Sequence, residues 1–178
     1  MLVKPILNQI LVELSQQVTY LNEPQLAQFA DKIVAAKHIF LVGAGRSGIM
    51  ISAFANRLMH LGLSVSLVNE ITKPKAQVGD LLIIASGSGE TASLIAYAEK
   101  AKQLGIDIAL ITMSEKSTLA TLADVKLCLP SQCVQYAQPM GSTFEQLSLL
   151  VYDSLVIMLA ELRQDSFDAM KNRHANIE

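Results

Sequence analysis

The stretch "GDLLIIASGSGET" (79–91) joins a short apolar run to a turn made of glycines and hydroxyl-bearing residues. Four consecutive apolar residues, "LLII" (81–84), are typical of a strand that is buried on both faces of a parallel sheet. The residues after the turn, "ASLIAYAEKAKQLG" (92–105), have helical spacing and end at a glycine. The stretch therefore predicts a strand, a turn and a helix, the repeating unit of an α/β fold.

The same unit recurs along the chain. A second apolar run, "HIFLVGAGRSG" (38–48), also ends in glycines, and further runs give five predicted strands, near 38–43, 65–68, 81–85, 107–112 and 125–129. Helical spacing fills most of the remainder, at 1–20, about 23–36, 49–62, 91–104 and from 142 past 162. We therefore expect a three-layer αβα sandwich with a five-stranded parallel sheet, of flavodoxin or Rossmann-like type.

The composition fits a globular domain without a nucleic-acid partner. The chain has 178 residues, of which 51% are hydrophobic and 17% charged, and its formal net charge is -2. We expect a single domain over 1–178, with a helical N-terminal segment at 1–36 and a C-terminal tail at 165–178. The small net charge provides no basic surface, so no nucleic-acid partner is expected.

Neither a membrane partner nor export is indicated. The longest apolar stretch (147–162) is interrupted by Asp153 and Ser154, and we expect it to fall short of a bilayer span. The first residues lack the features of a signal peptide, and Cys128 and Cys133 are expected to be reduced thiols, which together favour a cytoplasmic protein. A chain this apolar has more apolar surface than one small domain can hide, so a homo-oligomer is expected.

The turn at 86–91 has the composition of a phosphate site. Ser86, Ser88 and Thr91 provide three hydroxyls, while Gly87 and Gly89 allow backbone N–H groups to approach an anion. The turn leads into a helix N-terminus, where free N–H groups and the helix dipole favour negative charge. A terminal phosphate monoester suits such a ring of neutral donors. The alternative is a capping turn, because Ser and Thr commonly cap helices and glycines commonly end strands.

The turn at 43–48 allows a second interpretation. Gly43, Gly45 and Gly48 complete a G-x-G-x-x-G pattern, and Glu70 lies near the place where an acidic residue would bind a ribose. A nucleotide-binding oxidoreductase is therefore a possible alternative, although it would leave the second glycine turn unexplained. In the phosphate interpretation, Ser47 adds a hydroxyl from this turn. Arg46 could contact the phosphate or other oxygens of a substrate, and a surface salt bridge is an equal alternative.

The motifs "GAGRSG" (43–48), "SGSGET" (86–91) and "GSTFEQ" (141–146) resemble the sugar isomerase (SIS) domain family. The resemblance covers nearly the whole chain and implies a five-stranded parallel sheet, phosphosugar binding and catalysis without a cofactor or metal. The stretches "RLMHLG" (57–62), "GSTFEQ" and "RHANIE" (173–178) look closest to members that act in the ribulose monophosphate pathway. Those members are aldose-ketose-type isomerases that interconvert 3-hexulose 6-phosphate and fructose 6-phosphate through an enediolate. A tetramer, or else a dimer, is also implied.

The resemblance also implies roles for residues of this chain. Ser86, Ser88 and Thr91 would hold the phosphate with Ser47, and Glu145 would be the catalytic carboxylate. From the residues alone, Ser142 and Glu145 also form the pattern of a capping box, so that alternative stays open.

Two histidines are further candidates. In the context of "RHANIE", His174 would open the sugar ring or shuttle protons, and its tail could reach the site of a neighbouring subunit; taken alone, it would be a solvated surface residue. His60 ends a predicted helix, where helix capping is favoured over catalysis.

Two alternatives remain within the family itself. One is an isomerase acting on a pentose or heptose phosphate, because the walls that select substrate length are not visible in sequence. The other is a non-catalytic sugar-phosphate regulator, which would keep the serine loop (residues 86–91) but would not need Glu145.

Overall fold

Five strands form one parallel sheet in the order β2-β1-β3-β4-β5. The computed structural model describes residues 2–130, 138–164 and 167–177, and its strands are β1 (Ile39–Gly43), β2 (Val65–Leu67), β3 (Leu81–Ala85), β4 (Asp107–Thr112) and β5 (Val125–Cys128). Each lies within one residue or so of its predicted position. The parallel sheet expected from the apolar runs is therefore confirmed.

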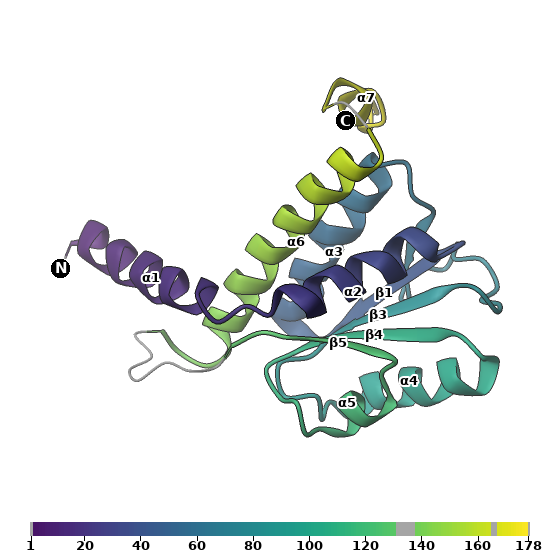
Figure 1. Cartoon of the computed structure of the whole chain (residues 1–178), viewed down its shortest axis with the longest axis horizontal. Helices are drawn as coiled ribbons and strands as arrows, with labels where there is room; N and C mark the ends of the chain where they lie inside the picture. The colour runs from purple at the N-terminus through teal and green to yellow at the C-terminus, as the bar shows by residue number, and fades with distance from the viewer. Residues whose placement is uncertain (1, 131–137, 165–166, 178) are drawn as a thin grey trace.

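Helices cover both faces of the sheet (Figure 1). One face carries α2 (Glu23–Ala35), α3 (Gly45–His60) and α6 (Ser142–Leu162), and the other carries α4 (Ala92–Leu104) and α5 (Thr118–Leu122). The three-layer α/β sandwich is confirmed. The expected tail at 165–178 contains a short helix, α7 (Phe167–Asn172), while residues 165, 166 and 178 lie outside the described residues.

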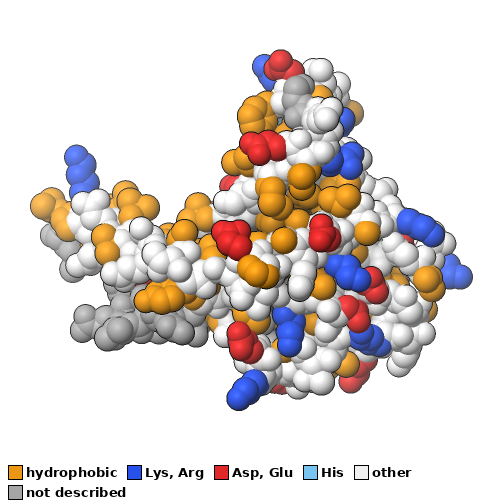
Figure 2. Space-filling view, in the orientation of Figure 1, with side chains coloured by type: hydrophobic (Ala, Val, Ile, Leu, Met, Phe, Trp, Pro, Cys, Tyr) orange, Lys and Arg blue, Asp and Glu red, His pale blue; other side chains and the backbone are white. Residues whose placement is uncertain are grey.

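The first helix, α1 (Val3–Val18), extends away from the body as an arm (Figure 1). Its buried residues are Glu13, Leu14 and Gln17, all in its C-terminal half. Apolar side chains lie along the arm among polar ones (Figure 2), and those exposed on and next to α1 are Leu2, Val3, Ile6, Leu7, Leu11, Val12 and Val18. The helix thus turns apolar residues outward, contrary to what a monomeric domain requires.

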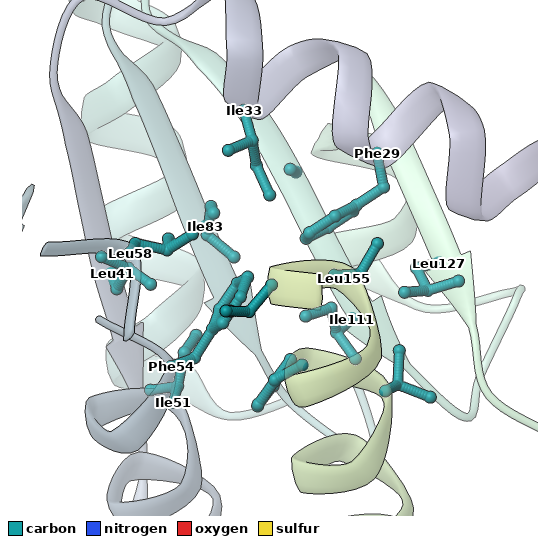
Figure 3. Close-up of a cluster of buried hydrophobic side chains, with 14 of the residues drawn as sticks. Phe29, Ile33, Leu41, Ile51, Phe54, Leu58, Ile83, Ile111, Leu127 and Leu155 are labelled. Carbon is teal, nitrogen blue, oxygen red and sulfur yellow. The ribbon is translucent and has the colours of Figure 1, made fainter. Parts of the chain in front are cut away.

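The core lies on both faces of the sheet because successive strand residues point in opposite directions. Leu41 of β1 and Ile83 of β3 pack with α2, α3 and α6 around Phe29, Phe54 and Leu155 (Figure 3). Their neighbours along the strands, including Val42 and Ile84, pack against α4 and α5. The central strands β1, β3 and β4 are buried on both sides, which explains the unbroken apolar runs in the sequence.

The central helix α6 corrects one expectation. It runs for 21 residues and, by length and composition, it is apolar enough to cross a membrane, although no apolar stretch was expected to reach that length. Asp153 and Ser154 do not interrupt it. Of its most apolar window, 56% is buried inside the fold, including Val151, Leu155 and Leu159. Its hydrophobicity is that of a core helix.

Candidate functional site

The two glycine turns leave the sheet side by side. β1 and β3 pair in parallel, with Gly43 opposite Ala85, so the turns at 43–48 and 86–91 follow neighbouring strand ends. β1 is flanked by β2 on its other side, so the strand order reverses at this point. Ligands of open α/β sheets bind at the carboxyl ends of the strands where the order reverses. The expected juxtaposition of the two turns is confirmed.

The glycine turn at 43–48 overlaps the start of a helix. α3 begins at Gly45, a few residues before the helical spacing becomes apparent in the sequence, so Arg46 and Ser47 lie in its first turn. A Cβ atom on Gly48 would lie 2.8 Å from the carbonyl oxygen of Gly43. These two glycines are therefore required by close packing of helix on strand.

Glu70, the acidic residue of the nucleotide interpretation, is engaged within its own turn. Its Oε2 accepts a hydrogen bond of 3.2 Å from the backbone N–H of Leu67. Together with the glycine packing, this contact accounts for the G-x-G-x-x-G pattern and its acidic partner without a nucleotide.

In the second turn, the hydroxyls organise the backbone and keep protons to donate. Ser86 is buried, and its Oγ accepts from the N–H of Gly89 at 3.1 Å and lies 3.5 Å from Thr91 Oγ1. Ser88 Oγ accepts from the N–H of Glu90 at 3.2 Å. Thr91 is the N-cap residue of α4, yet its side chain makes no capping bond. Since a hydroxyl that accepts can still donate, the turn retains donors for an anion at the N-terminus of α4.

Two neighbouring segments hold this loop, and the sequence reasoning missed both. Thr112, the last residue of β4, donates to the carbonyl of Gly87 at 3.2 Å. Glu90 accepts from the N–H of Thr118 at 2.7 Å and from its Oγ1 at 2.8 Å, which ties the loop to α5. A threonine ending an otherwise apolar strand beside β3 was the available signal for Thr112.

The link between Glu90 and Thr118 predicts an acid-sensitive contribution to stability. The hydrogen bonds from the backbone and the hydroxyl of Thr118 lower the pKa of Glu90 below its ordinary value of 4.5. A depressed carboxyl pKa stabilises the fold above the unfolded-state pKa, and that contribution disappears as pH falls through the folded-state pKa. We expect Glu90→Gln to lower the thermal midpoint at pH 7, and the difference from wild type to shrink near pH 4. Thermal scans of both proteins at the two pH values measure the difference in midpoint. A difference that is the same at pH 7 and pH 4 would contradict this prediction.

The third motif supplies the carboxylate. Glu145 lies in the first turn of α6, and its Oε2 is 3.0 Å from Nη1 of Arg46. The same guanidinium nitrogen donates to Ser142 Oγ at 3.2 Å. Arg46 is 59% exposed at its side chain and Glu145 only 12%, so the pair is open on the side of the arginine. The salt bridge considered for Arg46 therefore exists, and its partner is the candidate catalytic residue.

The capping box between Ser142 and Glu145 does not form. The N-cap of α6 is Gly141, and Ser142 is already the first helical residue. The Ser142 hydroxyl donates to the carbonyl of Pro139 at 2.8 Å instead. Although Glu145 Oε2 lies near Arg46, it is buried and receives no hydrogen bond of normal geometry from the described residues, so the contact is ionic.

Packing brings the third motif to the second. A Cβ atom on Gly87 would lie 3.3 Å from the ring of Phe144, the residue before Glu145. The first turn of α6 thus rests on the serine loop, while Arg46 reaches it from α3. Ser47 is half-buried in the same turn of α3 as Arg46. The three motifs therefore meet at the carboxyl edge of the sheet.

His174 lies away from the place where the three motifs meet. Its ring stacks on that of His60, with centroids 5.0 Å apart, at the C-terminal end of α3. Arg173 donates to the carbonyl of His60 at 2.9 Å and fixes the tail there. Burial, followed by the neighbouring His174 and Arg57, lowers the pKa of His60. At 1.5 Å per residue, the helix α3 places His60 about 21 Å along its axis from Arg46. His174 and Glu145 of one chain are therefore far apart.

Two cavities lie outside this arrangement. One of about 300 Å³ opens on the β2 side of the first turn and is lined by residues that include Gly45, Ser52 and Asn69. Another, of about 230 Å³ and largely apolar, lies beside α4 between Phe40 and Leu104. Neither is lined by Ser86 or Glu145, so neither corresponds to the site that these residues form.

Comparison with known proteins identifies the family of this arrangement. A protein-family model described as the SIS domain matches residues 32–158. The chain belongs to the SIS domain family. The matched region of the SIS domain contains all three motifs that meet at the sheet edge, and it confirms the resemblance noted from the sequence.

Similar SIS proteins include named isomerases. The chain is 41% identical over 177 residues to the 3-hexulose-6-phosphate isomerase of Bacillus subtilis (strain 168), with 96% of each chain covered. It is 36% identical over 175 residues to the 3-hexulose-6-phosphate isomerase of Mycobacterium gastri, covering 93% of this chain and 86% of that one. A crystal structure of a hypothetical protein from Methanococcus jannaschii, described as inferring 3-hexulose-6-phosphate isomerase function, matches with a TM-score of 0.85 and 34% identity over 99% and 98% of the two chains.

Proposed function

We propose that this chain is a 3-hexulose-6-phosphate isomerase that interconverts 3-hexulose 6-phosphate and fructose 6-phosphate. The observation that carries the proposal is the meeting of the serine loop with the buried carboxylate of Glu145 and the guanidinium of Arg46. Relatives that are 36–41% identical over most of their length and bear that name support the choice of substrate. One SIS domain over 1–178, including the N-terminal helices and the tail, would form the subunit.

Each group has a distinct task in the proposed mechanism. The hydroxyls of Ser86, Ser88 and Thr91, helped by Ser47 and by backbone N–H groups at the N-terminus of α4, bind the phosphate. Glu145 accepts the proton as the C3–H bond of fructose 6-phosphate breaks, which gives a 2,3-enediolate. The same carboxyl returns the proton to C2, while the hydroxyl proton leaves O3 and O2 gains one. Arg46 stabilises the negative oxygens of the enediolate.

The presence of Glu145 favours an enzyme over a sugar-phosphate regulator. A buried carboxylate oxygen without a hydrogen bond costs stability, so a module that only binds phosphate has no use for it. The carboxylate also lies one residue from the side chain that contacts the phosphate loop. That proximity suits a short substrate held at one end by its phosphate, with the base acting a few carbons away.

Deuterium exchange tests the proposal. The protein is incubated with fructose 6-phosphate in deuterated water, and the sugar is followed by NMR. We expect deuterium at C3, because the enediolate is reprotonated from solvent-exchanged base. Exchange at C1 alone would indicate a different isomerase, and binding without any exchange would indicate a regulator. Ribose and heptose phosphates, tested in parallel, serve as substrate-length controls.

A second copy of the chain would cover the apolar arm. The exposed residues of α1, together with Leu150 and Ile157 on α6, form more apolar surface than a monomer normally displays. We include a homo-oligomer, a tetramer or dimer, in the proposal. Light scattering should give two or four times the mass of 19.3 kDa, and a monomer at micromolar concentration would contradict it.

The assembly would also give His174 a role. Because His174 stacks on His60, about 21 Å along α3 from Arg46 of its own chain, it can act on the sugar only in the site of another subunit. There it would open the ring or move protons between the oxygens. The proposal includes a cytoplasmic location and a place in the ribulose monophosphate pathway, in formaldehyde fixation or pentose supply. A phosphorylated anionic substrate, which does not cross a bilayer unaided, supports the cytoplasmic location.

A further inference from the structure

The arm helix α1 docks on the body through two polar residues beside one leucine. Glu13 is 4% exposed, Gln17 is 1% exposed and Leu14 is 7% exposed, whereas Leu7 and Leu11 are half exposed. Hydrophobic burial accounts for Leu14, but by itself it would leave the glutamate in water. A buried carboxylate needs a specific partner to compensate for lost hydration.

The partner of Glu13 is in the first turn of α6. Thr143 is itself buried, and its Oγ1 donates a hydrogen bond to Oε1 of Glu13 across 130 positions of sequence. Thr143 is the second residue of α6, and Glu145 is the fourth. A carboxylate at this place also interacts favourably with the N-terminal end of the helix dipole.

The first turn of α6 is therefore held from two sides. Arg46 of α3 contacts Ser142 and Glu145 on one side, and Glu13 of α1 bonds Thr143 on another. A hydrogen bond to a charged acceptor fixes direction, whereas apolar packing does not. The turn carries the carboxylate that the proposed reaction uses.

We propose that Glu13 is a positioning residue for isomerisation. It holds Thr143 and thereby fixes the orientation of Glu145 relative to the serine loop. The inference rests on the proposed function, because it takes Glu145 as the base. It also gives the arm a catalytic consequence: a second copy seated on the apolar side of α1 steadies the helix that supplies Glu13.

Glu13→Gln and Thr143→Val test the inference. Both keep side-chain size and weaken or remove the bond. We expect kcat to fall about 10- to 100-fold, since small displacements of a reacting group have effects of that order. The dissociation constant for fructose 6-phosphate should stay within about twofold, because the phosphate loop belongs to other elements. Thr143→Ser, which keeps the hydroxyl, should recover most of kcat, and the double variant should be no worse than the worse single one.

Control variants separate this inference from the proposed function. Glu23→Gln, which changes an exposed glutamate in the first turn of α2, should leave kcat unchanged. Wild-type kcat in both Glu13→Gln and Thr143→Val, with Glu145→Gln inactive, would overturn the positioning role alone. An equal loss of kcat and of fructose 6-phosphate binding would also overturn it, since that is the result of general damage. Full activity of Glu145→Gln would overturn the base role of Glu145 and the positioning role with it, whereas a wild-type protein without exchange at C3 would overturn the proposed function. If Glu13→Gln does not fold, the kcat values of Thr143→Val and Thr143→Ser test the positioning role instead.

Discussion

Glu145→Gln is expected to lower kcat by about 10³-fold, with fructose 6-phosphate binding nearly unchanged. A general base contributes on the order of 10² to 10⁴ to the rate, and an amide of the same size cannot take the proton. In the proposed mechanism the serine loop holds the phosphate, and that loop lies between β3 and α4, outside the helix that carries the substitution. Steady-state kinetics and calorimetric binding of fructose 6-phosphate measure the two quantities separately.

The matched control for Glu145 lies on the same helix. Glu161 is exposed near the end of α6, and Glu161→Gln should retain wild-type kcat. Deuterium exchange at C3 should disappear in Glu145→Gln and persist in Glu161→Gln. Retained exchange in Glu145→Gln would transfer the base role to another group.

Gly89→Ala is expected to destabilise the fold by about 2–4 kcal/mol, the range of severe backbone and packing defects. Gly89 has a φ of 69°, and a Cβ there would lie 2.0 Å from Ser117 Oγ. Ser117 cannot give way easily, because it is buried and its hydroxyl accepts from the N–H of Ala120 as the N-cap of α5. The loop must then shift, and we expect the affinity for fructose 6-phosphate to fall at least tenfold. Urea unfolding and calorimetry measure the two effects.

Gly45→Ala isolates the conformational part of that cost. Gly45 has a similar φ of 56°, but a Cβ there would meet no atom within 4 Å. Only the penalty for a left-handed alanine remains, about 1–2 kcal/mol. If both alanine variants lost the same stability, the contact with Ser117 would not be the reason for the glycine at position 89.

The sheet could be predicted from sequence because its three central strands, β1, β3 and β4, are buried on both faces. Runs such as "LLII" are distinctive, and a parallel sheet places all carboxyl ends at one edge, so the meeting of the two glycine turns followed as well. The convergence of Arg46 with Glu145 did not follow, since the pairing depends on how α6 packs beside α3. Local patterns suggested a capping box at Ser142, and tertiary contacts with Pro139 and Arg46 replaced it.

Other features had no local signature. Glu13 meets Thr143 across 130 positions, and nothing in an amphipathic helix indicates which polar residue will be buried. The motif assigned His174 to a site in its own or a neighbouring subunit, and within its own chain the stack on His60 holds it at the opposite end of α3 from Arg46. The spacing of residues along a helix gives this separation directly once the helix is known.

The contact between Gly43 and Gly48 bears on how glycine patterns are interpreted in other proteins. The G-x-G-x-x-G spacing reflects how closely a helix can pack against the strand before it. Either a sugar phosphate or a dinucleotide can bind where the helix and strand lie this close. Screens that look for G-x-G-x-x-G as a sign of redox enzymes will therefore also collect SIS domain proteins such as this chain. The residues that distinguish the two kinds of protein follow the neighbouring strand, β3, where hydroxyl side chains come after the apolar run.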